Sequence, residues 1–130
     1  MFSYLRGTVT VTLVMLFYPL LRFTNHTVKP QPRHIAVSKT LPVGGVHTEH
    51  DFILFMLDNG PLAVSRKCTH LGCRVNFRQE LNLIECPCHQ SRFSIQGTRL
   101  AGPAKEDLTT FAVKVMEGEK GEITGYVVTI

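Results

Sequence analysis

The chain has no cysteine outside one short stretch, because all four of its cysteines lie between Cys68 and Cys88. It also lacks any run of lysine or arginine, and its net charge of +4 and pI near 9.0 are modest. The sequence therefore lacks the clustered basic residues with which nucleic-acid-binding proteins contact phosphates. No internal repeat is present, and no segment after Leu21 shows helical periodicity. A single site built by all four cysteines is therefore the feature to explain.

Two short cysteine–histidine clusters contain that site. The first is CTHLGC at Cys68–Cys73, and the second is CPCH at Cys86–His89. Each cluster supplies one Cys and one His at tight spacing, Cys68 with His70 and Cys86 with His89. In a Rieske 2Fe-2S cluster one iron takes two thiolates and the other takes two imidazoles. These four residues are therefore the predicted iron ligands.

Two other interpretations use the same residues. Structural zinc sites are usually spaced C-x2-4-C and H-x3-5-H, and the single-residue gap between Cys68 and His70 fits that template poorly. Two plain disulfides among four cysteines would allow three connectivities. That interpretation would leave His70 and His89 unexplained.

The motifs resemble those of the Rieske iron–sulfur proteins, specifically the membrane-anchored subunit of quinol–cytochrome c oxidoreductases of the cytochrome bc type. CTHLGC and CPCH stand in the family's form, and Ala101–Ala104 (AGPA) matches the family's proline-containing covering loop. The resemblance implies an all-β fold, an antiparallel β-sandwich with an inserted cluster-binding subdomain at about 66–104. It also implies a disulfide between Cys73 and Cys88. Such a bridge would indicate an oxidising compartment.

The resemblance gives roles to four further residues around the cluster. Leu71 matches an apolar residue that shields the cluster, and Pro103 lies in the covering loop. Ser91 matches a serine whose hydroxyl points at a bridging sulfide. Phe93 matches a tyrosine that donates to a ligand cysteine, and a phenylalanine cannot donate. We therefore expect a lowered potential, which favours menaquinol as the electron donor.

The function implied is one-electron transfer from membrane quinol to a c-type cytochrome. The chain would be the iron–sulfur subunit of an oxidoreductase, incomplete as an enzyme without a cytochrome b subunit. Two neutral histidines make the cluster less negative than four thiolates do, so it accepts an electron more readily. Each histidine also keeps a second ring nitrogen that can carry a proton.

Two other function classes use the same kind of cluster. One is the Rieske relay subunit of a periplasmic oxidase such as arsenite oxidase. The other is a soluble Rieske ferredoxin that feeds an oxygenase, which the predicted anchor and the two extra cysteines disfavour.

The N-terminal region is predicted to be a membrane anchor over residues 1–23. Thr8–Leu21 carries no charge and is bounded by Arg6 and Arg22. At 1.5 Å per residue this run covers about 21 Å of the roughly 30 Å of a hydrocarbon layer. A cleavable signal peptide is the alternative, but no A-x-A pattern follows the run. The expected location is the bacterial inner membrane, single-pass, with the Rieske domain on the extracytoplasmic side.

A polar, proline-containing linker or hinge is predicted at 24–33, followed by the Rieske domain at 34–130. Within that domain the predicted strands are Ile35–Val37, Phe52–Leu57, Leu62–Ser65, Asn82–Glu85, Phe111–Met116 and Tyr126–Ile130. Turns are expected at Pro42–Gly45 and at Asp58–Pro61. The other histidines, His26, His34, His47 and His50, are expected at the surface. A metal patch of His47, Glu49 and His50 is a minor alternative.

Overall fold

The computed structural model describes residues 2–24 and 31–130. The chain divides into two compact units, Met1–Gln31 and Pro32–Ile130, and each is described here by itself. Most of the predicted linker lies outside the described residues. Its last residue, Arg33, exchanges two backbone hydrogen bonds with Ile130 at 2.8 and 2.9 Å.

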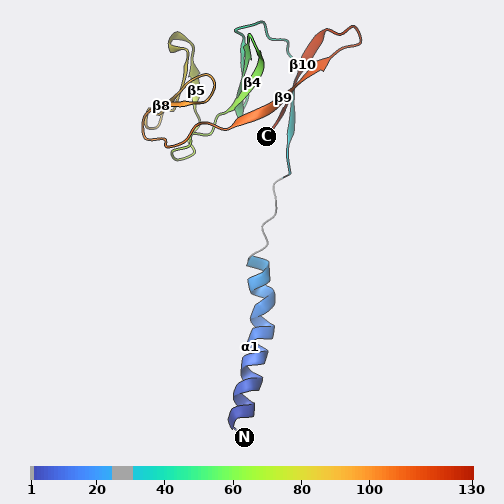
Figure 1. Ribbon diagram of the computed structural model, residues 1–130, viewed down its shortest axis with the longest axis vertical. Coiled ribbons are helices and arrows are strands. Elements are labelled where there is room, and N and C mark those ends of the chain that lie inside the picture. The colour runs from blue at the N-terminus through green and yellow to red at the C-terminus, as the bar shows by residue number, and fades with distance from the viewer. Residues whose placement is uncertain (1, 25–30) are drawn as a thin grey trace. The chain divides into compact units, whose positions relative to one another are not determined.

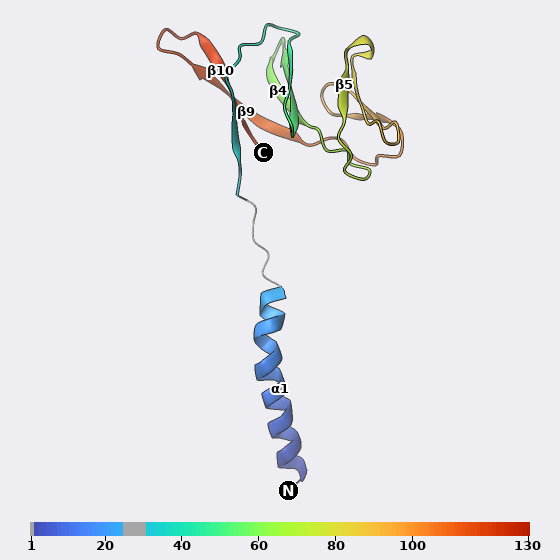
Figure 2. The same cartoon turned by 180° about the vertical axis from the view of Figure 1, so that it is seen from behind.

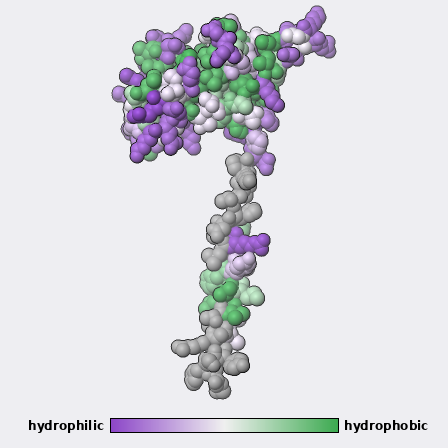
Figure 3. Space-filling view, in the orientation of Figure 1, coloured by the Kyte–Doolittle hydropathy of each residue, from purple (hydrophilic) through white to green (hydrophobic). Residues whose placement is uncertain are grey.

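The first unit contains one helix, α1, at Phe2–Thr24 (Figure 1). Its described side chains are largely apolar and exposed, among them Val14, Met15 and Phe17 (Figure 3). The Thr12 hydroxyl donates to the carbonyl of Thr8 at 2.9 Å, which satisfies a polar group within the helix itself. Pro19 lies inside the helix and cannot donate a backbone hydrogen bond there. Within the described residues, no helix combines the length and apolar content needed to cross a bilayer.

The second unit is built from two antiparallel sheets. The larger has the strand order β1-β10-β9-β4-β3-β2, and the smaller has the order β5-β6-β7-β8. The strands of the larger sheet are β1 (His34–Val37), β2 (Val46–Thr48), β3 (Phe52–Leu57), β4 (Gly60–Ser65), β9 (Thr110–Glu117) and β10 (Ile123–Thr129). Those of the smaller sheet are β5 (Asn76–Arg78), β6 (Leu83–Glu85), β7 (Arg92–Phe93) and β8 (Arg99–Ala101), with a short 3-10 turn, η1, at Gln79–Leu81.

Strand β3 lies between two hydrophobic cores, which explains its unbroken apolar sequence FILFML. Phe52, Leu54 and Met56 pack with residues of β1 and β10 in one core. Ile53 and Phe55, on the opposite face, pack with the cysteine loops in the other core. A strand buried on both faces has no need for polar alternation.

The arrangement of these cores defines the layers of the unit. In both views the β3–β4 hairpin lies between the β9–β10 pair and the smaller sheet (Figures 1 and 2). The first core therefore joins two halves of the larger sheet face to face, as in a β-sandwich. The second core attaches the smaller sheet. The predicted all-β fold, an antiparallel sandwich with an attached smaller subdomain, agrees with this arrangement.

The turn predicted at Asp58–Pro61 is shorter than expected. Gly60 already pairs with Leu57 and Pro61 with Met56, so only Asp58 and Asn59 form the loop. Gly60 has φ +121, which a glycine adopts freely. Pro61 is tolerated in the strand because the β4–β9 pairing is confined to Ala63 and Val64.

The short strands β2, β5, β7 and β8 were missed by the sequence analysis. Each has only two or three residues, so none can show a period-2 pattern. The turn predicted at Pro42–Gly45 is present, since the Gly45 N–H donates to the Pro42 carbonyl at 2.8 Å. Strand β9 is longer by one residue at each end than the predicted Phe111–Met116.

Gly125 marks a close approach between β10 and β1. A Cβ at this residue would overlap the carbonyl oxygen of Val37 and lie 3.3 Å from the Cα of Ser38. The β9–β10 register also shifts between Ile123 and Gly125, so this glycine lies at an irregularity in the ladder. Both neighbours are backbone atoms and cannot rotate away.

We therefore expect Gly125→Ala to destabilise the second unit by about 1–3 kcal/mol through overpacking. The matched control is Gly118→Ala, whose new Cβ would meet the movable carboxylate of Glu122. Thermal unfolding of the two variants measures the difference, at about 4–8 °C per kcal/mol for a domain of this size. Equal midpoints in both variants would contradict the close approach.

Candidate metal centre

The two cysteine–histidine clusters fold into loops with the same backbone hydrogen bonds. In the first loop the Cys68 N–H donates to the Cys73 carbonyl at 2.8 Å, and the Gly72 N–H donates to the Cys68 carbonyl at 2.9 Å. In the second, Cys86 and Ser91 repeat the first bond, and Gln90 and Cys86 repeat the second, both at 2.9 Å. The two loops therefore have equivalent backbone hydrogen bonds, and the first cysteine holds the same position in each.

The fifth residue of each loop turns the chain back. Gly72 and Gln90 both have positive φ, 76° and 56° respectively. Glycine adopts this conformation freely, whereas for an L side chain it costs about 1–2 kcal/mol. Gln90 therefore keeps a strained backbone conformation. Such strained residues are common beside functional sites.

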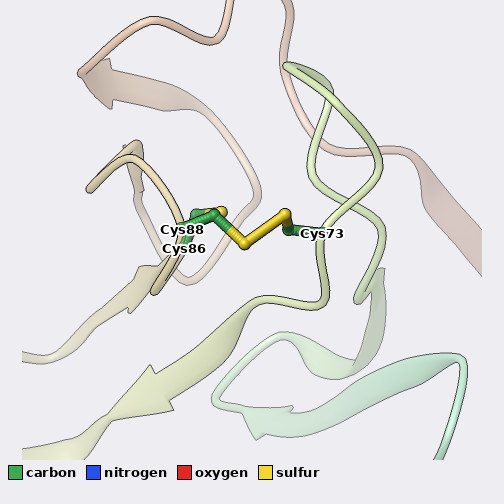
Figure 4. Close-up of side chains that lie close together, drawn as sticks. All are labelled: Cys73, Cys86 and Cys88. Carbon is green, nitrogen blue, oxygen red and sulfur yellow. A yellow bond between two sulfur atoms is a disulfide. The ribbon is translucent and has the colours of Figure 1, made fainter.

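A disulfide between Cys73 and Cys88 joins the two loops (Figure 4). Their Cα atoms lie 6.6 Å apart, and the bridge closes a sequence separation of 15 residues. In the chain-entropy model such a closure is worth about 3 kcal/mol. The bridge predicted from the family resemblance is confirmed, and the interpretation as two disulfides is wrong, because Cys68 and Cys86 are free.

The two free cysteines are buried beside each other in the core next to β3. Cys68 is 2% exposed and Cys86 is 1% exposed. Burial raises the pKa of the Cys68 thiol, and a hydrogen bond to the Cys86 side chain raises it further. Two adjacent thiols without a positive partner are unfavourable as thiolates. A bound metal ion would reverse that preference, since coordinated thiols lose their protons.

The two histidines lie on the same side of the loops. Their imidazole rings approach with centroids 4.9 Å apart and planes at 88°. The Nδ1 atom of His70 is buried and has no hydrogen-bond partner in the described structure. Buried polar atoms are almost always paired, so an unpaired one calls for a missing partner such as a metal ion.

Ser91 connects the second loop to the segment that follows β8. Its side chain is fully buried, and its hydroxyl accepts the N–H of Ala104 at 3.1 Å. The presence of this hydroxyl lowers the pKa of the Cys68 thiol and so opposes the effect of burial. Gly102 lies against the backbone here, where a Cβ would be 2.5 Å from the Cα of Ser91. The predicted covering loop therefore packs directly on the cysteine loops.

The remaining sequence-predicted site residues occupy different environments. Leu71 is 70% exposed at the tip of the first loop, which is unusual for a large aliphatic side chain, and Pro103 is also exposed. Phe93, on β7, is fully buried in the same core as Cys68 and Cys86. Its ring is thus near the sulfurs and offers no hydrogen-bond donor.

Two residues that support the loops were missed by the sequence analysis. The Thr69 hydroxyl donates to the Glu106 carbonyl at 2.7 Å, which ties the first loop to the segment after Ala104. Arg66 donates to the carbonyls of Val75 and Glu49 at 3.1 and 2.9 Å. All three acceptors are backbone carbonyls that lie 9 to 37 residues away along the chain, and no local pattern signals them.

The histidines outside the motifs do not form the minor metal patch. His47 contacts Glu49 at 2.8 Å, whereas His50 contacts Asp51 at 2.7 Å. His34 contacts the hydroxyl of Thr129 at 2.9 Å. His26 lies outside the described residues.

The donor set fits a mixed cysteine–histidine metal centre. The sulfur atoms of Cys73, Cys86 and Cys88 lie within 4.8 Å of one another. Two of these three are consumed by the disulfide and cannot act as thiolates. The sulfurs available to a metal are therefore those of Cys68 and Cys86, with the imidazoles of His70 and His89 close together at the same loops.

Comparison with known proteins agrees with this donor set. Residues 31–112 match the sequence profile of the Rieske [2Fe-2S] domain family. The chain is 29% identical over 125 residues to the cytochrome b6-f complex iron-sulfur subunit of Chlorobaculum tepidum, covering 87% of this chain and 67% of the relative. It is 34% identical over 85 residues to the corresponding subunit of Synechococcus sp. strain JA-3-3Ab, covering 63% of this chain and 48% of the relative.

A solved structure is similar as well. The cyanobacterial plasma membrane Rieske protein PetC3 from Synechocystis PCC 6803 superposes with a TM-score of 0.51 at 29% identity, over 72% of this chain and 84% of that one. The matched family holds a 2Fe-2S cluster, and the unpaired Nδ1 of His70 and the two buried thiols are donor groups suited to such a cluster. The chain therefore belongs to the Rieske [2Fe-2S] domain family.

Proposed function

We propose that this protein carries single electrons from membrane quinol to a c-type cytochrome within a cytochrome bc-type complex. The proposed iron ligands are Cys68, His70, Cys86 and His89. The observation that supports this set most strongly is the buried Nδ1 of His70, which has no partner among the described residues, on a ring whose centroid lies 4.9 Å from that of His89.

When bound, the 2Fe-2S cluster supplies a one-electron acceptor and donor. The chain's own residues then determine what approaches it. His70 turns its Nδ1 inward, so Nε2 is the ring nitrogen left to hold a proton or to accept one from a quinol hydroxyl. Leu71 is exposed beside it and offers an apolar contact for a docking surface. Ser91 and the loop ending at Ala104 exclude water from the buried side.

The partners are proposed from the relatives. Their names place them in cytochrome b6-f complexes, so a cytochrome b subunit and a cytochrome acceptor are the proposed partners here. The chain spans about two thirds of the first relative and about half of the second. Because the chain matches only part of each relative, the complex and its substrates are proposals for this chain.

Membrane attachment through residues 1–23 is part of the proposal, with 24–33 as linker and 34–130 as the Rieske domain. The uncharged run at Thr8–Leu21 supports it, and so do the exposed apolar side chains on α1. The related cyanobacterial structure is named a plasma membrane Rieske protein. The Cys73–Cys88 disulfide favours an oxidising compartment, and therefore the extracytoplasmic side of a bacterial inner membrane.

Menaquinol is the proposed donor because of Phe93. A charge-assisted hydrogen bond to a ligand sulfur is worth about 1.5–3 kcal/mol, and only part of it differs between oxidation states. About 1.4 kcal/mol corresponds to roughly 59 mV for one electron. The missing donor at Phe93 therefore lowers the potential by several tens of millivolts, which suits a low-potential quinol.

Purification of the tagged full-length chain from native membranes tests the proposed complex. We expect b-type haem and a c-type cytochrome to co-purify with it, visible in reduced-minus-oxidised spectra. Recovery with a molybdenum protein, or as a soluble monomer without haem, would contradict the bc-type assignment.

Replacing either proposed histidine ligand tests the cluster assignment. We expect His70→Ser and His89→Ser to abolish the Rieske-type EPR signal of the reduced protein, at low average g, because a hydroxyl does not replace a neutral imidazole. His47→Ser is the matched control, since His47 is half-buried and its ring contacts Glu49 in the described structure. A normal signal in both ligand variants, with the fold checked by circular dichroism, would remove the assignment.

Restoring a donor at Phe93 tests the proposed tuning. We expect Phe93→Tyr to raise the midpoint potential by several tens of millivolts without loss of the cluster. Phe77→Tyr is the control, because Phe77 packs edge-on against Phe55 at 5.1 Å in the same core. An unchanged or lower potential in Phe93→Tyr would show that residue 93 does not tune the cluster, and the menaquinol proposal would fail with it.

A further inference from the structure

A small basic pocket lies next to the first cysteine loop, outside the proposed iron ligands. It has a volume of about 250 Å³ and is lined by His50, Asp51, Arg66, Lys67, Gly72 and Arg74. Lys67 and Arg74 pair across the base of the loop, which brings their side chains to the same rim. The pocket therefore gathers three cationic side chains around one carboxylate.

That carboxylate is already engaged. Asp51 accepts hydrogen bonds from His50 at 2.7 Å and from Arg33 at 3.2 Å, one on each oxygen. The hydrogen bond from His50, together with the charge of Arg33, lowers the pKa of Asp51, so the carboxyl stays ionised. Both of its oxygens are occupied by groups other than the three cations of the pocket.

His50 does not neutralise the pocket either. Arg74 approaches the Nε2 of His50 at 2.6 Å, and a guanidinium can only donate. Nε2 is therefore the acceptor, and the hydrogen of the neutral ring is on Nδ1, where it donates to Asp51. The imidazole thus contributes no negative charge to balance Arg74.

The guanidinium of Arg66 makes its hydrogen bonds to neutral groups. It is held in place by two backbone carbonyls and by the Asn76 side chain at 2.7 Å, all of them neutral groups. Arg66 is partly buried and lies beside Arg74 in the lining of the pocket. A fixed, partly desolvated cation beside a second cation is unfavourable unless an anion joins them.

We propose that this pocket binds a phosphate oxyanion between Arg66, Lys67 and Arg74. A guanidinium fork matches the oxygens of a phosphate, and a lysine adds a mobile point charge. The Cε of Lys67 lies 3.5 Å from where a Cβ at Gly72 would stand, so the lysine bends over the loop toward the pocket. The pocket is open to solvent on one side and has room for one such group rather than for an extended chain. This site is separate from the proposed function, since none of its residues is a proposed iron ligand.

The phosphate can come from two sources, free inorganic phosphate or the headgroup of an anionic lipid. Thermal unfolding of the full-length, cluster-containing protein is measured with increasing sodium phosphate, against sodium chloride at equal ionic strength. A ligand that binds only the folded state raises the unfolding midpoint in proportion to the logarithm of its concentration. We expect a rise with phosphate and none with chloride.

Matched variants assign the effect to the pocket. We expect Lys67→Gln and Arg74→Gln to weaken phosphate binding at least ten-fold, while Lys114→Gln, an exposed lysine on β9, leaves it unchanged. Both pocket side chains are exposed, so these variants keep the fold, as circular dichroism would verify. Equal effects of phosphate and chloride, or an equal loss in Lys114→Gln, would overturn the proposal.

Two further measurements distinguish a lipid headgroup from free phosphate and test an acidic peptide as a competing ligand. If vesicles of phosphatidylglycerol, but not of phosphatidylcholine, displace bound phosphate from the wild type, the site takes a lipid headgroup; if neither does, it takes the free ion. Binding of hexaglutamate more tightly than phosphate would overturn the proposal and indicate an acidic protein surface instead.

Discussion

The convergence of two equivalent loops on one buried space is the constraint on which the rest of the site depends. Each loop closes on itself through backbone hydrogen bonds and directs its first cysteine inward. The disulfide holds the loops together from the outer side, while the free thiols of Cys68 and Cys86 meet on the inner side. Such a space is stable only when something compensates two adjacent thiols and an unpaired imidazole nitrogen. A 2Fe-2S cluster of the Rieske family, held by the proposed ligands, would provide that compensation.

The β-sheets connect the packing of the cysteine loops to that of the whole domain. Because β3 buries both of its faces, the core that supports the sandwich and the core that surrounds the cysteines share one strand. The covering loop adds a third contact, through the hydrogen bond between Ala104 and the fully buried Ser91. Order in the sandwich and order in the cysteine loops are therefore coupled, while the tips of the loops at Leu71 and His89 stay open to a partner.

The sequence predicted the kind of metal centre better than it predicted the contacts that hold the cysteine loops in place. The Cys–His spacing predicted a 2Fe-2S centre at these loops because ligand geometry acts over two or three neighbouring residues. The long strands were predictable for the same reason, as in the continuous apolar run of β3. The strands β7 and β8 are too short to show a pattern. The contact of Thr69 with Glu106 and the basic pocket arise from segments far apart in sequence. No local pattern encodes them.

The central claim is that two histidine nitrogens, one from each loop, bind the same iron. Pulsed EPR of the reduced protein, labelled with ¹⁵N at Nδ1 of histidine, tests it most directly. The account predicts two strongly coupled ¹⁵N nuclei in the wild type and also in His47→Ser, because His47 is not a proposed ligand. A cluster with no coupled histidine nitrogen, or with coupling that survives removal of both His70 and His89, would contradict it.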